Sequence, residues 1–411
     1  MASSVRHPTG KPHRAAPHAS GPRLLYGPPL APRKGPSHMC TDHPKPGLAP
    51  SRRQTLLGGL ATTAVAATAL ATAPATSAAP RSKKRDMDFA LVPLGIQGGP
   101  PPHPNQAGIS TALVVNGDVY LIDCGRASLS QFVNAGLPVP RLRSIFLTHL
   151  HADHCIDFAT YTQLAAQFPT QYTYKNPIHA YGPGTAGKPT GKLKDGDQWA
   201  NAGQATPGTR EMLELLNNAF SGSANFFLKE HFIGDPAKMI IAHDIEIPAE
   251  LNASADNTAP SAQPFEVMAD ENVRVTATLV PHGAVYPALA YRFDTEHGSV
   301  VFSGDTAPSD NLIRLARNCD ILVHEAVELE ASASRMGWNE TTMKHMRDVH
   351  TDVNEIGRIA KEANAGHIVL SHLVPDTLSH QEWQAALRKS VRRASYTGRT
   401  TVAQELRDVP L

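Results

Sequence analysis

The segment Thr148-His149-Leu150-His151-Ala152-Asp153-His154 places three imidazoles and one carboxylate within six consecutive residues. It follows Ser144-Ile145-Phe146-Leu147-Thr148, a pattern typical of a buried strand, and it precedes a predicted helix. Because side chains alternate along an extended segment, the first two histidines face the same side, whereas the aspartate and the third histidine fall at the turn. Imidazole and carboxylate ligands together suit Zn²⁺. An ordinary His-rich loop is the alternative, but the segment predicts a strand end that serves two neighbouring metal ions.

Three later segments each place one further metal-binding side chain after a predicted strand. They are Val280-Pro281-His282-Gly283, Phe302-Ser303-Gly304-Asp305-Thr306 and Leu370-Ser371-His372-Leu373. The two histidines add imidazoles, and the aspartate adds a carboxylate that is able to bridge two metals. Taken alone, each of these histidines would more often be a surface or core residue, so their weight comes from their order and context.

Together, these segments resemble the metal-binding motifs of the metallo-β-lactamase superfamily, whose signature is HxHxDH. The resemblance spans residues 89–408 and implies an α+β fold, a four-layer αβ/βα sandwich of two mixed sheets flanked by helices. It implies one zinc ion on His149, His151, His282 and Asp305, and a second on Asp153, His154, Asp305 and His372. Such a pair lowers the pKa of a bridging water and supplies a metal-activated hydroxide, which Asp153 would orient.

Three other segments resemble the ribonuclease Z-like branch of this superfamily. They are Leu121-Ile122-Asp123-Cys124-Gly125, the run from Asp320 to Ala326 that contains His324-Glu325-Ala326, and His350-Thr351. In that branch a Glu–His pair assists proton delivery to the leaving oxygen, and the matching residues here are Glu325 and His350. A histidine held by a carboxylate suits this task. From sequence alone, a helix-start role for His350 and a loop-capping role for Glu325 remain open.

The chain departs from ribonuclease Z in two respects. That family usually follows its last metal histidine with Ser and Arg, whereas Leu373-Val374-Pro375-Asp376 follows here. Thirteen of the 38 Lys and Arg residues but only one of the 37 Asp and Glu residues lie in 1–85, which leaves 25 basic and 36 acidic residues beyond. An acidic body argues against a nucleic-acid partner, because phosphate backbones are bound largely by Lys and Arg.

We therefore expect a di-zinc metallohydrolase that cleaves a phosphodiester or sulfate ester in a small molecule, similar to exported phosphodiesterase-like and arylsulfatase-like relatives. Hydrolysis of a lactone or β-lactam and ribonuclease Z-type cleavage at the 3′ end of tRNA are the enzymatic alternatives. A metal-binding scaffold without activity is the non-enzymatic one. Dimers are common among such relatives, so a homodimer is a further expectation.

A leader is expected before the hydrolase domain. Ser51-Arg52-Arg53 opens an Ala- and Thr-rich segment that ends near Ala79 and is typical of a signal peptide, and its paired arginines resemble a twin-arginine export signal. Its weak hydrophobicity argues against a stable membrane anchor. We predict a disordered extension over 1–50, the signal over 51–79, a linker over 80–88 and the hydrolase domain over 89–408. This predicts a secreted or periplasmic protein that contacts the export machinery transiently and starts at Met1 or Met39.

The rest of the chain predicts alternating strands and helices. Asn116-Gly117 predicts a hairpin between 111–115 and 118–123. The segment 168–264 is rich in Gly, Pro, Asn and Ala, and is interpreted as a long insertion over the site with one helix at 210–219. Three cysteines follow the leader, an odd number that predicts free thiols. Further expected strands are 273–280, 288–293, 299–302, 321–323 and 367–370, and further expected helices are 159–167, 311–317, 353–364 and 381–393.

Overall fold

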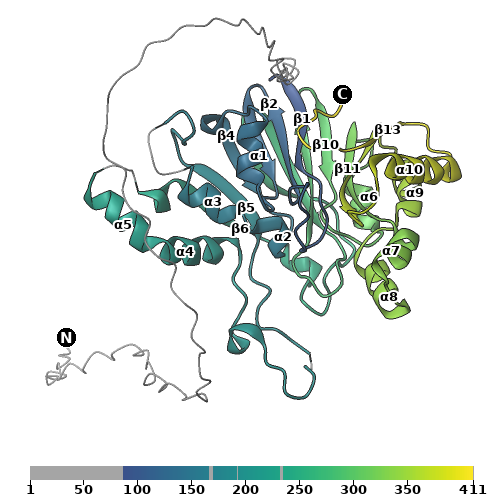
Figure 1. Ribbon diagram of the computed structural model, residues 1–411, viewed down its shortest axis with the longest axis horizontal. Coiled ribbons are helices and arrows are strands. Elements are labelled where there is room, and N and C mark those ends of the chain that lie inside the picture. Colours follow the sequence, from purple (N-terminus) through teal and green to yellow (C-terminus); the bar gives the residue numbers. More distant parts are fainter. Residues whose placement is uncertain (1–86, 166–169, 192, 232–234, 411) are drawn as a thin grey trace, which may run out of the picture. The chain divides into compact units, whose positions relative to one another are not determined.

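The computed structural model describes residues 87–165, 170–191, 193–231 and 235–410 (Figure 1). The predicted extension over 1–50, the predicted signal over 51–79 and most of the predicted linker lie outside these residues. None of the helices in the described ranges is both long enough and apolar enough to span a bilayer.

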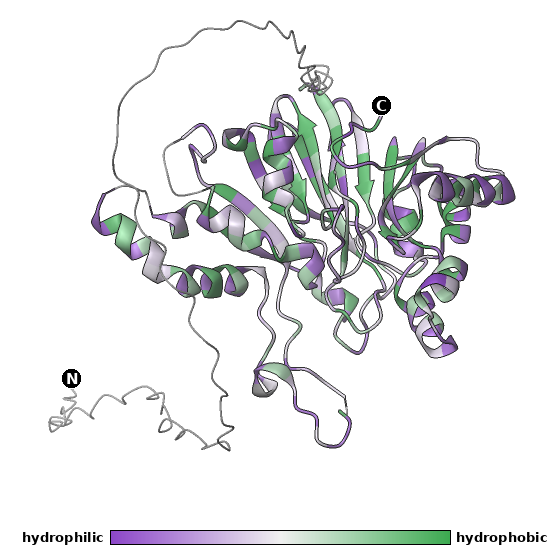
Figure 2. Cartoon of the chain, viewed as in Figure 1, coloured by the Kyte–Doolittle hydropathy of each residue, from purple (hydrophilic) through white to green (hydrophobic). Residues whose placement is uncertain are grey.

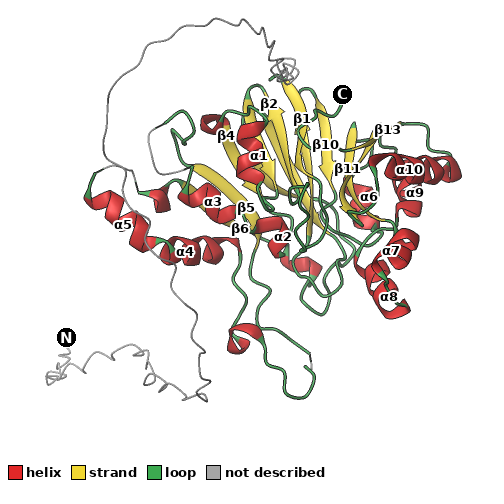
Figure 3. Cartoon of the chain, in the orientation of Figure 1, coloured by secondary structure: helices red, strands yellow, loops and turns green. Residues whose placement is uncertain are grey.

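Two mixed β-sheets form the centre of the described chain (Figure 3). In the first sheet, β1 to β3 are antiparallel neighbours, and β3 to β6 run parallel. Its strands lie in chain order: β1 (Phe89–Gly95), β2 (Ser110–Val115), β3 (Asp118–Ile122), β4 (Leu142–Phe146), β5 (Ile178–Pro183) and β6 (Ile240–Ile245).

The second sheet repeats this division into an antiparallel and a parallel half. Strands β7 to β10 pair antiparallel, whereas β10 to β13 pair parallel. Its strands are β7 (Phe265–Ala269), β8 (Val273–Leu279), β9 (Leu289–Thr295), β10 (Gly298–Phe302), β11 (Ile321–Val327), β12 (His367–Val374) and β13 (Arg399–Val402).

Helices cover the outer face of each sheet. Between successive strands of the first sheet, the chain forms α1 (Ser128–Asn134), α2 (Ala152–Cys155), α3 (Phe158–Gln163), α4 (Thr209–Ala219) and α5 (Ser221–Lys229). The second sheet carries α6 (Asp310–Leu315), α7 (Leu329–Met336), α8 (Glu340–Val349), α9 (Val353–Glu362) and α10 (His380–Ala394). Short 3₁₀ turns occupy Val139–Arg141, Ala200–Gly203, Pro236–Lys238 and Ala249–Leu251.

Three apolar clusters hold these layers together. The cluster between the sheets combines residues of both, among them Phe146 of β4 and Phe293 of β9, whose rings meet edge to face at 4.9 Å. A second cluster lies between the first sheet and α1, α3 and α4, and a third lies between the second sheet and α6, α9 and α10. Strands that are buried on both faces consist of mostly apolar residues. These strands are green in Figure 2, where green marks hydrophobic residues. The predicted four-layer α+β sandwich is confirmed.

The interpretation of 168–264 as one insertion is wrong in part. This segment contains β5 and β6, which extend the first sheet beyond β4. Both strands are only partly buried, and β6 is an edge strand with Ile241 exposed, so neither produced a recognisable buried run. The predicted helix at 210–219 is confirmed as α4, which packs on β5 and β6.

The cysteine prediction is confirmed for the described part of the chain. Cys124, Cys155 and Cys319 are free and buried. Burial raises the pKa of each thiol, to about 11 for Cys155 and about 12 for Cys319, so these side chains behave as small apolar residues.

Candidate metal centre

The HxHxDH segment connects the end of β4 to α2. His149 follows β4 and is fully buried, whereas His151 is exposed at the position before α2. Asp153 and His154 lie in the single turn of α2, and both are buried. The change from strand to helix places the second pair of side chains at the turn, as the sequence predicts, with the rings of His149 and His154 4.1 Å apart.

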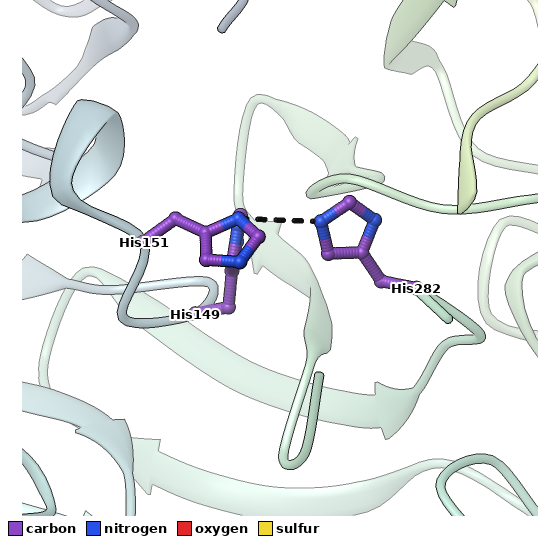
Figure 4. A group of neighbouring side chains, drawn as sticks. All are labelled: His149, His151 and His282. Carbon is purple, nitrogen blue, oxygen red and sulfur yellow. Dashed lines mark hydrogen bonds between the residues drawn. The ribbon is translucent and has the colours of Figure 1, made fainter. Parts of the chain in front are cut away.

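The later segments bring their side chains to the same place. His149, His151 and His282 present ligand nitrogens that all lie within 4.8 Å of one another (Figure 4). Asp153, His154 and His372 form a second group by the same measure. The structure therefore gathers side chains from three separate segments of the chain into two adjacent groups.

Asp305 lies between these two groups. Its Oδ2 atom is 3.4 Å from His154 Nε2 and 3.3 Å from His372 Nε2. The same oxygen is 3.9 Å from Nε2 of both His149 and His282. A single carboxylate that reaches both groups is placed to bridge two cations.

Several buried polar atoms of this cluster have no hydrogen-bond partner among the described residues. Buried polar atoms are nearly always paired, so a group of unpaired ones at one point indicates a missing partner. All of the atoms concerned are potential metal ligands: His149 Nε2, His154 Nε2, His372 Nε2, Asp153 Oδ1 and Asp305 Oδ1. Imidazole nitrogens with carboxylate oxygens are ligands that zinc accepts, and the residues present fit such ions.

Burial and neighbouring charges set the protonation of the cluster. Burial holds the pKa of His149 well below its ordinary value, and it also lowers the pKa of His282, which favours the neutral imidazole that a metal requires. Burial alone would raise the pKa of Asp305, but the imidazoles of His372 and His154 hold it well below the ordinary value. The bridging position therefore carries a carboxylate.

A second layer of contacts orients the ligands. His154 Nδ1 lies 2.8 Å from Asp123 Oδ2, and the other oxygen of Asp123 accepts from the backbone N–H of Thr148 at 2.8 Å. His282 Nδ1 lies 2.7 Å from the carbonyl oxygen of Val349. Each contact leaves Nε2 free to bind a metal. Sequence reasoning assigned no role to Asp123, although this residue lies in the segment 121–125 that resembles the ribonuclease Z-like branch.

Glu325 and His350 lie together beside the ligand cluster. Glu325 Oε1 is 3.0 Å from His350 Nδ1 and accepts from the backbone N–H groups of Thr306 and Thr351 at 3.0 and 3.2 Å. His350 Nδ1 is 4.0 Å from Asp305 Oδ2. Burial alone would lower the pKa of His350, but the Glu325 carboxylate raises it to about 9. The structure therefore brings all the sequence-predicted site residues into one region.

Comparisons with known proteins place this geometry in a family. A family model described as "Beta-lactamase superfamily domain" matches residues 239–373, and one described as "Anti-Pycsar protein Apyc1" matches residues 107–181. Ribonuclease Z of Mycobacterium bovis (strain BCG / Pasteur 1173P2) is 26% identical over 313 residues, which cover 76% of this chain and 95% of the relative. Ribonuclease Z of Mycobacterium tuberculosis (strain ATCC 25618 / H37Rv) is 27% identical over 312 residues, which cover 76% and 94%.

Among solved structures, human tRNase Z, short form, aligns with a TM-score of 0.51 at 19% identity, covering 78% of this chain and 98% of that chain. The chain has the metallo-β-lactamase fold and is similar in sequence to ribonuclease Z. In this metallo-β-lactamase-fold protein, the two family matches between them contain every residue of the metal cluster: the HxHxDH segment lies in 107–181, and His282, Asp305 and His372 lie in 239–373. The family and the ligand groups together support a metal-dependent hydrolase.

Proposed function

We propose that this protein is an exported di-zinc hydrolase that cleaves a phosphodiester or sulfate ester in a small molecule. The observation that carries the proposal is the Glu325–His350 pair at the edge of the ligand cluster. Displacement of an alkoxide from phosphorus or sulfur gains from a proton donor at this position, because the leaving oxygen takes up a proton as it departs.

The residues divide into two ligand sets and a proton-transfer pair. One zinc ion would be held by His149, His151, His282 and Asp305, and the other by Asp153, His154, Asp305 and His372. When bound, the two ions would activate water and stabilise the charge that develops on the ester.

The chain's own groups would perform the remaining tasks. Asp153 Oδ1 is buried without a hydrogen-bond partner among the described residues, so this oxygen is available to orient the attacking water. His350 would donate a proton to the leaving oxygen. Glu325 would hold His350 through Nδ1, which leaves Nε2 as the donating atom.

A second candidate is cleavage at the 3′ end of tRNA, and the similarity to proteins named ribonuclease Z favours it. The charge of the chain argues for the small-molecule substrate, since the part beyond residue 85 contains 36 acidic residues and only 25 basic ones. The position after the last metal histidine also departs from the ribonuclease Z pattern.

A substrate panel on zinc-loaded protein tests the proposal. The panel comprises bis-p-nitrophenyl phosphate, p-nitrophenyl sulfate, a lactone, nitrocefin and a tRNA precursor. We expect turnover of the phosphodiester or the sulfate, with much weaker activity on the other three. Preferred cleavage of the tRNA precursor, or of nitrocefin, would replace the proposed substrate class.

The His149→Ala variant tests the metal assignment in the same assay. Removal of this buried ligand should lower the bound zinc from two ions toward one and reduce kcat/KM by about 100-fold or more, because the activated water depends on both ions. Zinc content is measured by atomic emission beside activity. Full zinc content with normal turnover would refute the ligand set.

A further inference from the structure

A depression of about 420 Å³ opens beside His350. Helices α7, α8, α9 and α10 all contribute to its wall, and His350 is the one residue of the candidate site among the described residues that line it. A leaving group that takes its proton from His350 would therefore occupy this depression. Its charges decide which leaving groups it accepts.

Three basic side chains line the depression: Arg347 of α8, and Lys389 and Arg393 of α10. Arg347 is paired with Glu340 at 3.0 Å. Neither Lys389 nor Arg393 has a hydrogen bond or ion pair with another described residue, and both side chains are exposed. By contrast, Lys344 and Arg358, which lie outside the depression on neighbouring helices, are paired with carboxylates at 2.6 and 2.9 Å.

The acidic residues of the wall do not neutralise these two cations. Glu355 is paired with Arg358 at 2.9 Å, and Asp352 caps α9 by accepting from the backbone N–H of Asn354 at 2.7 Å. Glu330 is the one acidic side chain of the wall that makes no such contact with a described residue. Lys389 and Arg393 are therefore the two basic side chains of the wall that are paired with no described carboxylate, whereas Asp352 and Glu330 each keep a negative charge.

We propose that Lys389 and Arg393 form a subsite for a second anionic group, carried by the alcohol portion of the ester that leaves. This inference rests on the proposed function and narrows its substrate class to esters that are charged on both sides of the scissile bond. The second group is a phosphate, sulfate or carboxylate. Arg393 can bind such a group through two parallel N–H donors, and Lys389 adds a compact charge.

A pair of synthetic diesters tests the subsite. Methyl 4-nitrophenyl phosphate and methyl 3-carboxy-4-nitrophenyl phosphate differ by one carboxylate on the leaving phenol. The wild-type protein should prefer the carboxylated ester in kcat/KM by about tenfold, chiefly through KM, as expected for two partly exposed cations. The preference should shrink as NaCl is raised, because salt screens exposed charges.

The variant K389E/R393E should abolish or invert this preference. Its turnover of methyl 4-nitrophenyl phosphate, which lacks the carboxylate, should stay within about twofold of the wild-type value. Arg392→Glu is the matched control, since Arg392 also lies in the last turn of α10 but does not line the depression. Glu330→Gln should increase the preference, because it removes a carboxylate of the wall that no described cation pairs.

A binding measurement separates failure of this inference from failure of the proposed function. The affinities of methylphosphonate monoesters of phenol and of 3-carboxyphenol are compared by calorimetry in wild type and in K389E/R393E. If the added carboxylate increases the affinity in wild type and this increase is lost in the variant, the subsite is supported. This holds even if neither diester is cleaved. Absence of cleavage would overturn only the proposed reaction. An unchanged preference in K389E/R393E, in kinetics or in binding, overturns the subsite.

Discussion

At the scale of single residues, contacts fix one ring nitrogen of two of the candidate ligands, His154 and His282, and leave the other nitrogen free. Asp123 holds His154 through Nδ1, and the carbonyl of Val349 holds His282 in the same way. Two residues of the centre, Asp123 and His372, have left-handed backbone conformations with φ of 57° and 45°. Such conformations are costly for residues other than glycine and persist where the surrounding structure enforces them.

The role of His350 can be tested through the leaving group. If His350 donates a proton to the leaving oxygen, His350→Ala should reduce kcat/KM by about 100-fold for an alkyl leaving group, but only severalfold for p-nitrophenol, which departs readily without a proton. Rates on a series of aryl and alkyl phosphodiesters measure this dependence. Glu325→Gln should show the same trend to a smaller degree, and equal losses across the series would contradict proton donation.

Gly98 contacts the last metal histidine closely enough to exclude any side chain. A Cβ atom at this position would lie 2.6 Å from Val374 Cγ2 and 2.8 Å from His372 Nδ1. We expect Gly98→Ala to displace the His372 imidazole and to weaken zinc binding at the second site by about tenfold or more. Competition with a chromophoric chelator measures the affinity. Gly222→Ala is the control, since a Cβ there meets nothing within 4 Å, and equal zinc affinities in both variants would argue against the contact.

At the scale of secondary-structure elements, the predictable parts are those with a strong local signal. The Asn116-Gly117 hairpin joins β2 and β3, and the predicted strand at 367–370 is the first half of β12. Helix α10 begins one residue earlier than predicted, because Ser379 and Glu382 form a capping box. The element α8 was not anticipated: its sequence is mostly polar, and only Met343 and Val349 of it are buried.

The candidate site was predictable to a different degree from residue to residue. The candidate metal ligands stand in recognisable motifs near strand ends, except that His372 lies within β12, so their convergence could be anticipated from order alone. The supporting contacts could not, because Val349 acts through its carbonyl oxygen and Gly98 through the absence of a side chain, and neither property appears in a motif.

The junction of β12 and β13 predicts a pH-dependent stability. His367 begins β12, is buried, and lies 2.8 Å from Thr401 Oγ1 of β13 through its Nε2 atom. Burial, aided by Arg399, lowers the pKa of His367 to about 4. Above pH 6.5 the imidazole is neutral in both folded and unfolded chains. As the pH falls toward 4, only the unfolded chain takes up the proton, so the folded state loses stability.

The variant His367→Gln removes this titration while keeping a polar partner for Thr401. Relative to wild type, its free energy of unfolding should improve by about 1–2 kcal/mol between pH 7.5 and pH 5. Denaturant titrations at both pH values measure the difference, and metal loss at acid pH cancels because both proteins contain the same ligands. A difference between the two proteins that does not change with pH would contradict the assignment.

At the scale of the whole molecule, charge divides the chain at about residue 85. The basic N-terminal part contains the Arg52-Arg53 pair, and the remainder is acidic. A twin-arginine signal exports chains that are already folded, so a hydrolase with a buried metal cluster could acquire its ions before export. We propose that residues 51–79 are such a signal, which would account for a basic N-terminal part joined to a metal-binding body.

Expression of the full chain in a bacterium with twin-arginine export tests this last prediction. The mature protein should appear outside the cytoplasm with an N-terminus between residues 73 and 82, as determined by mass spectrometry. The double substitution Arg52→Lys and Arg53→Lys should retain the protein inside the cell as an uncleaved chain with unchanged zinc content, since neither residue belongs to the ligand cluster. Export that is indifferent to this substitution would contradict the twin-arginine route, and a mature start far from 73–82 would contradict the cleavage site.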